Sequence, residues 1–442
     1  MRRTLVSLAI AAVILAAGLT AACSSAATSG TAATSETRAS STTASVSSAN
    51  GGLFDNSVVH DVSVSFAQAD YDAMIQTYKT SGVKDSIKAT VTIDGTSYQN
   101  VGMRLKGNSS IRGLKDGRTG GPGGNVSAAK PEGLPWLINL DKNVDGQNHD
   151  GITEFVIRSN NSKTSLNEAV SLELLRMAGL ASQKATPVGF SVNGSGAVLR
   201  LATENPDDVW MAKHFSDRGA LYKAESTGDY SYRGPDPDSY GDVFDQEAGK
   251  DNVGLAPLIQ FLDFVNNAAD ATFMSTLPER LDIESFTTYL AMEELIGNFD
   301  DIDGPGNNSY LYYDPAAGRF TVVPWDHNLA FGGISGGDRP GPGNFNGAPP
   351  AAGAPQGAGA PPGGGPRGKS NILVQRFHAN TEFEALYQQR LSELKTQLYG
   401  TGAAADVLAG WVKVLKTQAS GLVDPATVDS EAAKITAYFQ AG

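Results

Sequence analysis

Apolar residues recur at every second position through much of the first half of the chain, a spacing that is typical of β-strands. Residues 58–66 alternate in this way. Two further alternating segments, 88–93 and 98–105, flank an Asp-Gly pair, and 188–192 and 197–202 flank an Asn-Gly pair. These dipeptides favour the two-residue turns of β-hairpins. The pattern therefore predicts a strand-rich first half that contains two hairpins.

Apolar spacings of three and four residues, which predict helices, dominate the second half. Helices are expected at 255–267 and 283–296, with a single hairpin at 310–323. In the first half the clearest helix is 165–178, and Gly179 suits its C-terminal end. Three more helices are expected near the C-terminus, at 383–398, 404–417 and 430–439. We therefore predict an α+β fold of two lobes, strand-rich and then helix-rich, with a C-terminal helical subdomain.

Two segments carry too few large apolar side chains to build a core. Residues 24–50 are nearly all Ser, Thr, Ala and Gly, and 336–368 is dominated by Gly, Pro and Ala. Both compositions are typical of chains without fixed structure. We expect a tether at 23–52, a folded domain at 53–335, an insert at 336–368 and the remaining helical part of the domain at 369–442.

The first 22 residues have the features of an export signal. Two arginines precede an apolar segment, residues 5–19, that is shorter than a membrane span needs. The segment ends in LTAAC (19–23), which resembles a bacterial lipoprotein signal with a lipid on Cys23. The alternative is an ordinary secretory signal with an incidental Cys. Both interpretations predict an extracytoplasmic protein, and the first predicts anchoring to the cell membrane through Cys23.

Length and charge limit the possible partners. The chain has 442 residues, of which 40% are hydrophobic, so a sizeable core is possible outside the low-complexity segments. The formal net charge is −13, and this acidic excess argues against nucleic acid as a partner. The five histidines are scattered without ligand spacing and there is one Cys, so we expect no zinc site.

Residues 297–328 combine an acidic loop with the predicted hairpin. Asp300 lies in the loop, Asn308 precedes the first strand, and Asp326 follows the second. Because a hairpin brings its outer ends together, we expect these three side chains to converge. Such oxygens can hold Mg²⁺ on a polyphosphate, with a further carboxylate to orient a hydroxyl. The alternatives are that Asn308 caps the strand and that the aspartates are turn residues.

Basic residues of the strand-rich half could bind the phosphates. The sequence KGNSS (106–110) directly follows a predicted strand and is a candidate backbone cradle for phosphate. We expect Lys106 or Lys130 to reach the phosphates, and Glu168 of the 165–178 helix to orient that lysine as its ion-pair partner. The alternative for all three is an exposed position on the surface.

Five sequence blocks together resemble the CotH kinase family, which contains the spore coat protein H and its relatives. The blocks are VGMRLKGNSS (101–110), SVNG (191–194), LYK (221–223), GNFD with NNSYLYY (297–313) and VVPWDHNLAF (322–331). The resemblance implies a distant protein-kinase-like fold that uses ATP and Mg²⁺ or Mn²⁺ to phosphorylate Ser or Thr of secreted or surface proteins. It further implies that Asp300 is the catalytic aspartate and that Asn308 and Asp326 bind the metal.

The chain departs from the family pattern at the metal site. Asn328 stands where relatives usually carry a second Asp, and His327 where an apolar residue is usual. The Lys-rich run of relatives is dispersed here, with Lys130 as its best survivor. We therefore consider two main hypotheses, a lipid-anchored extracytoplasmic Ser/Thr kinase acting on Ser/Thr-rich proteins and a catalytically silent surface interaction or adhesion protein. A third hypothesis is nucleotidyl transfer from the same metal site.

Overall fold

The computed structural model describes residues 52–116, 126–226, 228–304, 307–332 and 371–441. The expected signal peptide, Cys23, nearly all of the expected tether and the whole of the expected insert lie outside the described residues. In the described part of the chain, no helix combines the length and the apolar composition that a membrane crossing requires.

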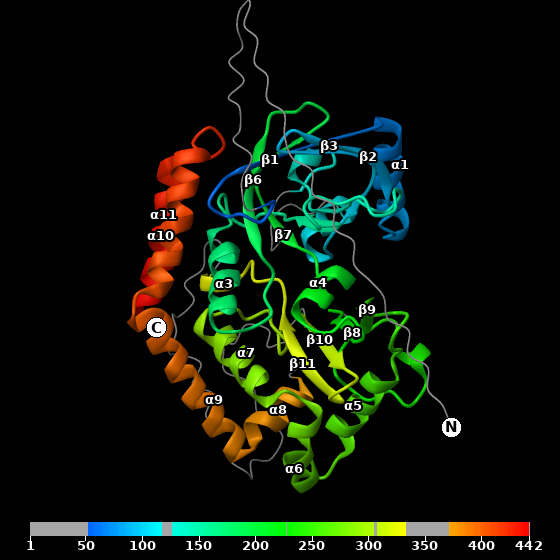
Figure 1. The fold of residues 1–442 in the computed structure, drawn as a ribbon, viewed down its shortest axis with the longest axis vertical. Coiled ribbons are helices and arrows are strands. Elements are labelled where there is room, and N and C mark those ends of the chain that lie inside the picture. Colours follow the sequence, from blue (N-terminus) through cyan, green and yellow to red (C-terminus); the bar gives the residue numbers. More distant parts are fainter. Residues whose placement is uncertain (1–51, 117–125, 227, 305–306, 333–370, 442) are drawn as a thin grey trace, which may run out of the picture. The chain divides into compact units, whose positions relative to one another are not determined.

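Seven strands of the described region close into a barrel in the order β1-β2-β3-β4-β5-β7-β6. Figure 1 labels five of them, β1, β2, β3, β6 and β7. They are β1 (His60–Phe66), β2 (Ile87–Ile93), β3 (Thr96–Leu105), β4 (Trp136–Asn139), β5 (Glu154–Ile157), β6 (Ala185–Val192) and β7 (Val198–Glu204). The parallel pairing of β1 with β6 completes the closure. Trp136, Phe155 and Phe190 are fully buried in the barrel core, and helix α1 (Gln68–Ser81) adds apolar side chains to the same cluster.

Two tight turns set the register of the predicted hairpins. Asp94 and Gly95 join β2 to β3 with φ of 46° and 87°, and Asn193 and Gly194 join β6 to β7 with φ of 48° and 77°. Positive φ at both central residues belongs to the type I′ turn, which matches the twist of paired strands. Both hairpins predicted from the sequence are therefore confirmed.

A second sheet has four antiparallel strands in the order β11-β10-β8-β9. The predicted hairpin supplies β10 (Ser309–Asp314) and β11 (Arg319–Pro324). The other two strands, β8 (Ala220–Ala224) and β9 (Phe244–Ala248), were not expected, so the prediction of a single hairpin in the second half was incomplete. Strand β8 is buried on both faces and β9 is apolar only at its ends, so neither carries the alternation that marks a half-exposed strand.

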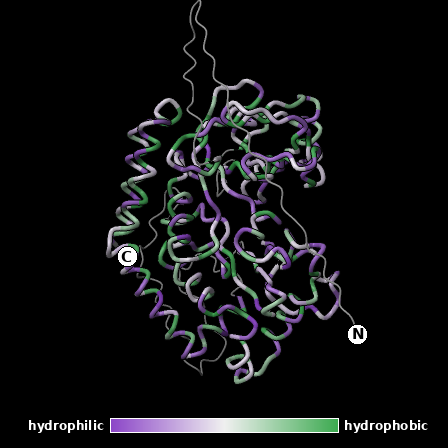
Figure 2. Tube along the Cα trace, viewed as in Figure 1, coloured by the Kyte–Doolittle hydropathy of each residue, from purple (hydrophilic) through white to green (hydrophobic). Residues whose placement is uncertain are grey.

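Helices make up most of the remaining structure. They are α2 (Arg112–Asp116), α3 (Leu166–Met177), α4 (Asp208–His214), α5 (Ala256–Asn267), α6 (Asp270–Arg280), α7 (Ile283–Leu295), α8 (Ile372–Ala379), α9 (Thr381–Leu394), α10 (Ala403–Gln418) and α11 (Pro425–Ala441). Helix α7 packs against α9, and α10 packs against both α3 and α11. Hydrophobic and hydrophilic residues interleave along these helices in Figure 2. The strands and helices together confirm an α+β protein.

Helix α3 begins and ends where the sequence predicts, and Gly179 follows it with φ of 89°. The helix is not half-exposed, however. Its buried residues lie on most of its circumference, because α3 contacts both β6 and α10. Glu168 is among them, with only 5% of its surface exposed. A surface position for Glu168 is therefore excluded, and its carboxylate needs a partner inside the protein.

Asp207 gives a prediction about stability. Its side chain caps α4 by accepting a hydrogen bond from the Trp210 backbone N–H, at 2.8 Å. Burial, aided by the charge of Glu154, raises the pKa of Asp207 to about 7. The folded state therefore binds an extra proton between about pH 4 and 7, and the free energy of unfolding falls as pH rises through that window.

Asp207→Asn should keep the cap and remove this pH dependence. We expect the variant to gain roughly 1 to 4 kcal/mol over the wild type at pH 8, since one pKa unit equals about 1.4 kcal/mol, and to gain little near pH 4. Chemical denaturation at both pH values measures the difference. Asp282→Asn, at the N-cap of α7, controls for replacing a capping aspartate. Equal pH dependence in wild type and Asp207→Asn would contradict the prediction.

Candidate active site

Asp300 and Asp326 line the same small cavity, which has a volume of about 60 Å³. The other walls are the turn after β3 (106–110), Arg158 after β5, and Asn328 after β11. Side chains from widely separated parts of the sequence thus face one space. The expected convergence of the two carboxylates is found, because both belong to the wall of one cavity.

The β10–β11 hairpin and a folded-back loop create this convergence. Ser309 pairs with Pro324 at the open end of the hairpin, so the segments that precede β10 and follow β11 are neighbours. In the acidic loop, Asp301 accepts backbone hydrogen bonds from Gly304 and Asn308, at 3.1 and 3.0 Å. A Cβ on Gly304 would lie 2.4 Å from the Phe299 carbonyl oxygen, so this close return requires glycine.

Arg158 joins two of the predicted site residues. Its Nη2 lies 2.7 Å from Glu168 Oε1 and also contacts Asp326 Oδ1. Burial alone would lower the pKa of Arg158, but the two carboxylates raise it above its usual value. Burial raises the pKa of Glu168, and Asp326 adds to this effect while Arg158 opposes it. The three groups therefore form one coupled, largely buried cluster.

This geometry corrects the expected partner of Glu168, which is Arg158 rather than a lysine. Sequence reasoning missed Arg158. The available signal was a cation directly after the apolar residues of β5, but that strand was not predicted either. Asp326 also has φ of 62°, an uncommon backbone conformation for a residue with a side chain. Such conformations concentrate at functional sites.

Lys106 is buried at the cavity, with 8% of its surface exposed. Its Nζ lies 5.7 Å from the centre of the Trp325 ring and, within the described residues, makes no ion pair or hydrogen bond. Burial lowers the pKa of Lys106, Glu247 opposes the shift, and Arg104 acts in the same direction as burial. A buried cation without an anionic contact favours a site for an anionic ligand.

The turn after Lys106 has the tightness expected of a backbone cradle. Gly107 has φ of 91°, and a Cβ at this position would lie 2.1 Å from Ser110 Oγ. Any larger residue would displace the Ser110 side chain, which lines the same cavity. Glycine therefore permits a tight turn next to the buried lysine. A tight turn beside a cation is suited to binding phosphate oxygens.

Further basic groups lie beside this turn. Lys84 Nζ donates to Asn108 Oδ1 at 2.6 Å, and Lys223 pairs with Glu225 at 2.5 Å. Burial lowers the pKa of Lys84 to about 8, and the charges of Arg104, Lys223 and Lys106 act in the same direction. This mutual repulsion, which Glu225 opposes, means that several cations lie close together beside the turn after β3, where they favour bound negative charge.

Three predicted site residues, Glu168, Lys130 and Asn308, are not among the residues that line the cavity. Lys130 is exposed and caps a short 3-10 helix, Pro131–Gly133, that precedes β4. Within this segment only Pro135 lines the cavity, and the assignment of Lys130 as a phosphate-binding residue stays a prediction. Asn308 is half-buried, and its backbone N–H bonds to Asp301. The assignment of Asn308 as a metal ligand remains a prediction.

The donor set at the cavity fits a hard divalent cation. Asp326 and Asn328 provide oxygen atoms, which Mg²⁺ and Mn²⁺ prefer, and the carboxylate of Asp300 lines the same cavity. The backbone carbonyl of Asn328 accepts from Asn167 Nδ2 at 2.5 Å, so this segment is fixed against α3. No three His, Cys, Asp or Glu side chains cluster for metal binding in the described regions. A cation here would therefore complete its coordination with ligand or water oxygens.

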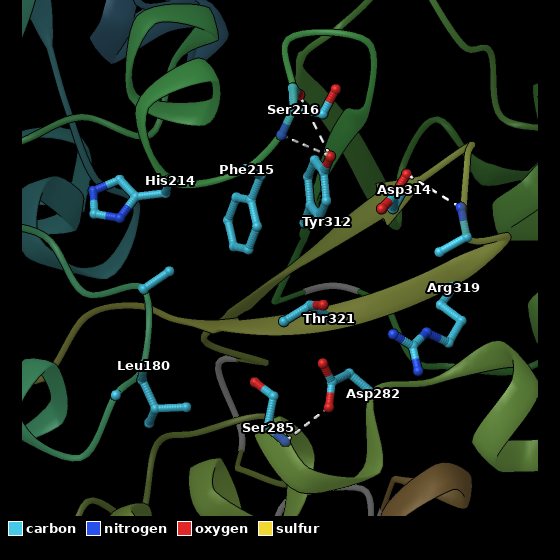
Figure 3. Close-up of a pocket in the computed structure, with 13 residues that line it drawn as sticks. Leu180, His214, Phe215, Ser216, Asp282, Ser285, Tyr312, Asp314, Arg319 and Thr321 are labelled. Carbon is cyan, nitrogen blue, oxygen red and sulfur yellow. Dashed lines mark hydrogen bonds between the residues drawn. The ribbon is translucent and has the colours of Figure 1, made fainter.

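A larger cavity of about 620 Å³ lies over the turn end of the β10–β11 hairpin (Figure 3). Phe215 stacks on Tyr312 in its wall, with ring centres 4.1 Å apart. Arg319 and Asp282 also line it, and Asp282 accepts from the Ser285 backbone N–H. None of the site residues predicted from the sequence borders this cavity. Size alone would favour it, but the convergent carboxylates and the buried lysine identify the smaller cavity as the candidate active site.

The fold and the cavity define an α+β protein whose candidate site sets carboxylates against buried cations. The sequence pattern of the CotH kinase protein family matches residues 106–407, more than half of the chain. The chain therefore belongs to the CotH kinase protein family, and the expected family membership is confirmed.

One curated relative is the inner spore coat protein H of Bacillus subtilis (strain 168). The two proteins are 23% identical over 180 residues, which make up 39% of this chain and 48% of the relative. The chain thus spans about half the length of the curated relative that it matches.

The Arg158 cluster predicts a large effect on stability. Arg158→Met leaves Glu168 buried with no cation beside it, and we expect the free energy of unfolding to fall by about 3 to 5 kcal/mol. The double variant Arg158→Met/Glu168→Met removes both charges and should recover most of this loss, as chemical denaturation at pH 7 would show. A double variant as unstable as the single one would disprove the claim that unpaired charge causes the loss.

Proposed function

We propose that the protein is an extracytoplasmic kinase that transfers the γ-phosphate of ATP to Ser or Thr of secreted or surface proteins. The observation that carries the proposal is the shared cavity of Asp300 and Asp326, with the buried Lys106 in its wall, which makes no ion pair with any residue that the structure describes. Phosphoryl transfer needs little covalent help from a protein. It needs phosphates held in place, their charge neutralised and the acceptor hydroxyl oriented.

Each residue then has a role that follows from its chemistry. Bound ATP with Mg²⁺ or Mn²⁺ would supply the phosphoryl group and neutralise its charge. Asp326 and Asn308 would hold the metal, with Asn328 as a further oxygen donor. Asp300 would accept a hydrogen bond from the acceptor hydroxyl and take its proton. Lys106 and the turn that follows it would bind the phosphates.

Arg158 and Glu168 have a supporting role in this proposal. Glu168 holds Arg158 from one side, while Asp326 contacts it from the other. The pair would therefore orient the Asp326 carboxylate at the edge of the cavity. The barrel would form the strand-rich lobe of a kinase-like arrangement, and the four-stranded sheet with its helices would form the other lobe.

The location of the protein is also part of the proposal. The apolar signal and Cys23 would place the folded domain outside the cytoplasm on a lipid anchor, with residues 24–50 as its tether. The name of the curated relative, inner spore coat protein H, refers to a coat protein and supports an extracytoplasmic setting. Proteins rich in Ser and Thr would be the acceptors.

A silent interaction protein is the second candidate, and two observations favour it. Arg158 contacts the carboxylate that would bind the metal, and the cavity of about 60 Å³ is well below the 300 to 1,000 Å³ that is usual for small-molecule sites. Nucleotide binding would therefore require Lys106 or Arg158 to move. In a protein without catalytic activity, the same ion pairs would only stabilise the fold around the cavity.

Phosphate transfer tests the kinase proposal. The soluble domain from Leu53 onward is incubated with γ-labelled ATP, Mg²⁺ or Mn²⁺ and a Ser-rich protein. We expect the wild type to transfer label, whereas Asp300→Asn and Asp326→Asn should each lose at least about a hundredfold in rate. Asp314→Asn is the matched control, because Asp314 lies at the opposite end of the hairpin and an Asn can keep its turn contact with the Ala316 backbone N–H.

The outcomes separate the three hypotheses. Label transfer that depends on Asp300 and Asp326 supports the kinase. Attachment of the whole nucleoside monophosphate, seen as a larger mass shift, would support nucleotidyl transfer. If the wild type binds no nucleotide in the presence of either metal, the surface interaction protein becomes the better explanation.

A further inference from the structure

A buried carboxylate on α7 holds the two loops of the candidate active site. Glu293 has 2% of its surface exposed. Its Oε1 accepts from His327 Nε2 and its Oε2 accepts from Asn298 Nδ2, each at 2.8 Å. His327 is fully buried and Asn298 is 4% exposed. Both oxygens of one carboxylate are thus used, and each binds a different loop.

The two donors are close in sequence to the two carboxylates of the site. Asn298 lies two residues before Asp300, and His327 directly follows Asp326. Backbone bonds at the end of α7 fix the same loops as well, since the Asn298 N–H donates to the Glu293 carbonyl at 3.0 Å and the Phe331 N–H donates to the Ile296 carbonyl at 2.8 Å. A shift of Glu293 would therefore move both loops at once.

Stability alone does not explain this cluster. Burying a carboxylate is costly, and apolar residues of similar size often replace buried polar groups without loss of stability. Two buried side-chain atoms of the cluster, His327 Nδ1 and Asn298 Oδ1, have no hydrogen-bond partner among the described residues. The bonds to Glu293 offset part of these costs. What the bonds provide is a fixed separation between two loops, which an apolar contact defines less sharply.

We infer that Glu293 is a positioning residue that sets the separation of Asp300 and Asp326 through Asn298 and His327. The expected effect on phosphate transfer rests on the proposed function. The expected effect on the metal affinity of the Asp326 loop does not require phosphate transfer. Because each arm serves one loop, the two effects are separable. The Asn298 arm orients the acceptor-binding carboxylate, and the His327 arm orients the metal-binding carboxylate.

Four variants of the soluble domain test the two arms. Asn298→Ala should lower kcat about tenfold or more and leave the Mn²⁺ Kd unchanged within about twofold, because only Asp300 loses its support. His327→Leu should raise the Mn²⁺ Kd about tenfold, an effect typical of supporting contacts around a metal ligand. Glu293→Gln keeps the size of the side chain and should show both effects. Asn298→Ala added to Glu293→Gln should cost little more kcat, since the shared bond is already weakened.

Leu262→Ala controls for lost stability. Leu262 is fully buried in the same apolar cluster as α7, on α5, and touches neither loop through a polar contact. At a matched fall in Tm, it should keep normal kcat and normal Mn²⁺ affinity. Normal kcat and Mn²⁺ affinity in Glu293→Gln would overturn the inference, and so would losses in all variants that simply follow Tm. If the wild type binds Mn²⁺ but transfers no phosphate, the kinase proposal fails and the Mn²⁺ measurements still decide the role of Glu293.

Discussion

The pairing of β10 with β11 is the constraint on which the rest of the site depends. Backbone hydrogen bonds fix Ser309 opposite Pro324, and this register places the segment before β10 beside the segment after β11. Asp300 and Asp326 reach one cavity for this reason. A strand register is specified strongly when one face is buried. The inward face of this hairpin, with Leu311 and Val322, belongs to the largest apolar cluster.

The electrostatics of the cavity come from charges that the fold buries at close range. Arg158 is shared between Glu168 and Asp326, whereas Lys106 has no anionic contact within the described residues. The first arrangement sets two carboxylates against one cation and so leaves negative charge over, and the second leaves a surplus of positive charge in the wall. A ligand that carries both a cation and phosphates would complement both parts, which is compatible with the proposed use of ATP.

The family match comes from the sequence and the cavity from the structure, and the two observations support each other. The family match covers the KGNSS turn, Asp300 and Asp326, and these are the parts that meet at the cavity. The departures from the family pattern also lie there. Asn328 lines the cavity with an amide in place of a carboxylate, and His327 turns into the core toward Glu293.

Local sequence was sufficient for the features that depend on neighbouring residues. Asp-Gly and Asn-Gly turns identified two hairpins, the spacing in 165–178 identified α3, and the β10–β11 hairpin implied that Asp300 and Asp326 converge. Each follows from backbone preferences over a few residues. This is also why the α+β class could be predicted.

Tertiary structure alone decided the partners of the charged groups. Arg158 rather than a lysine pairs with Glu168, Lys106 is buried while Lys130 is exposed, and the parallel pairing of β1 with β6 closes the barrel. These outcomes depend on which elements pack together across long stretches of chain. A pattern of polar and apolar positions states that a side chain needs a partner, but only packing determines which partner lies within reach.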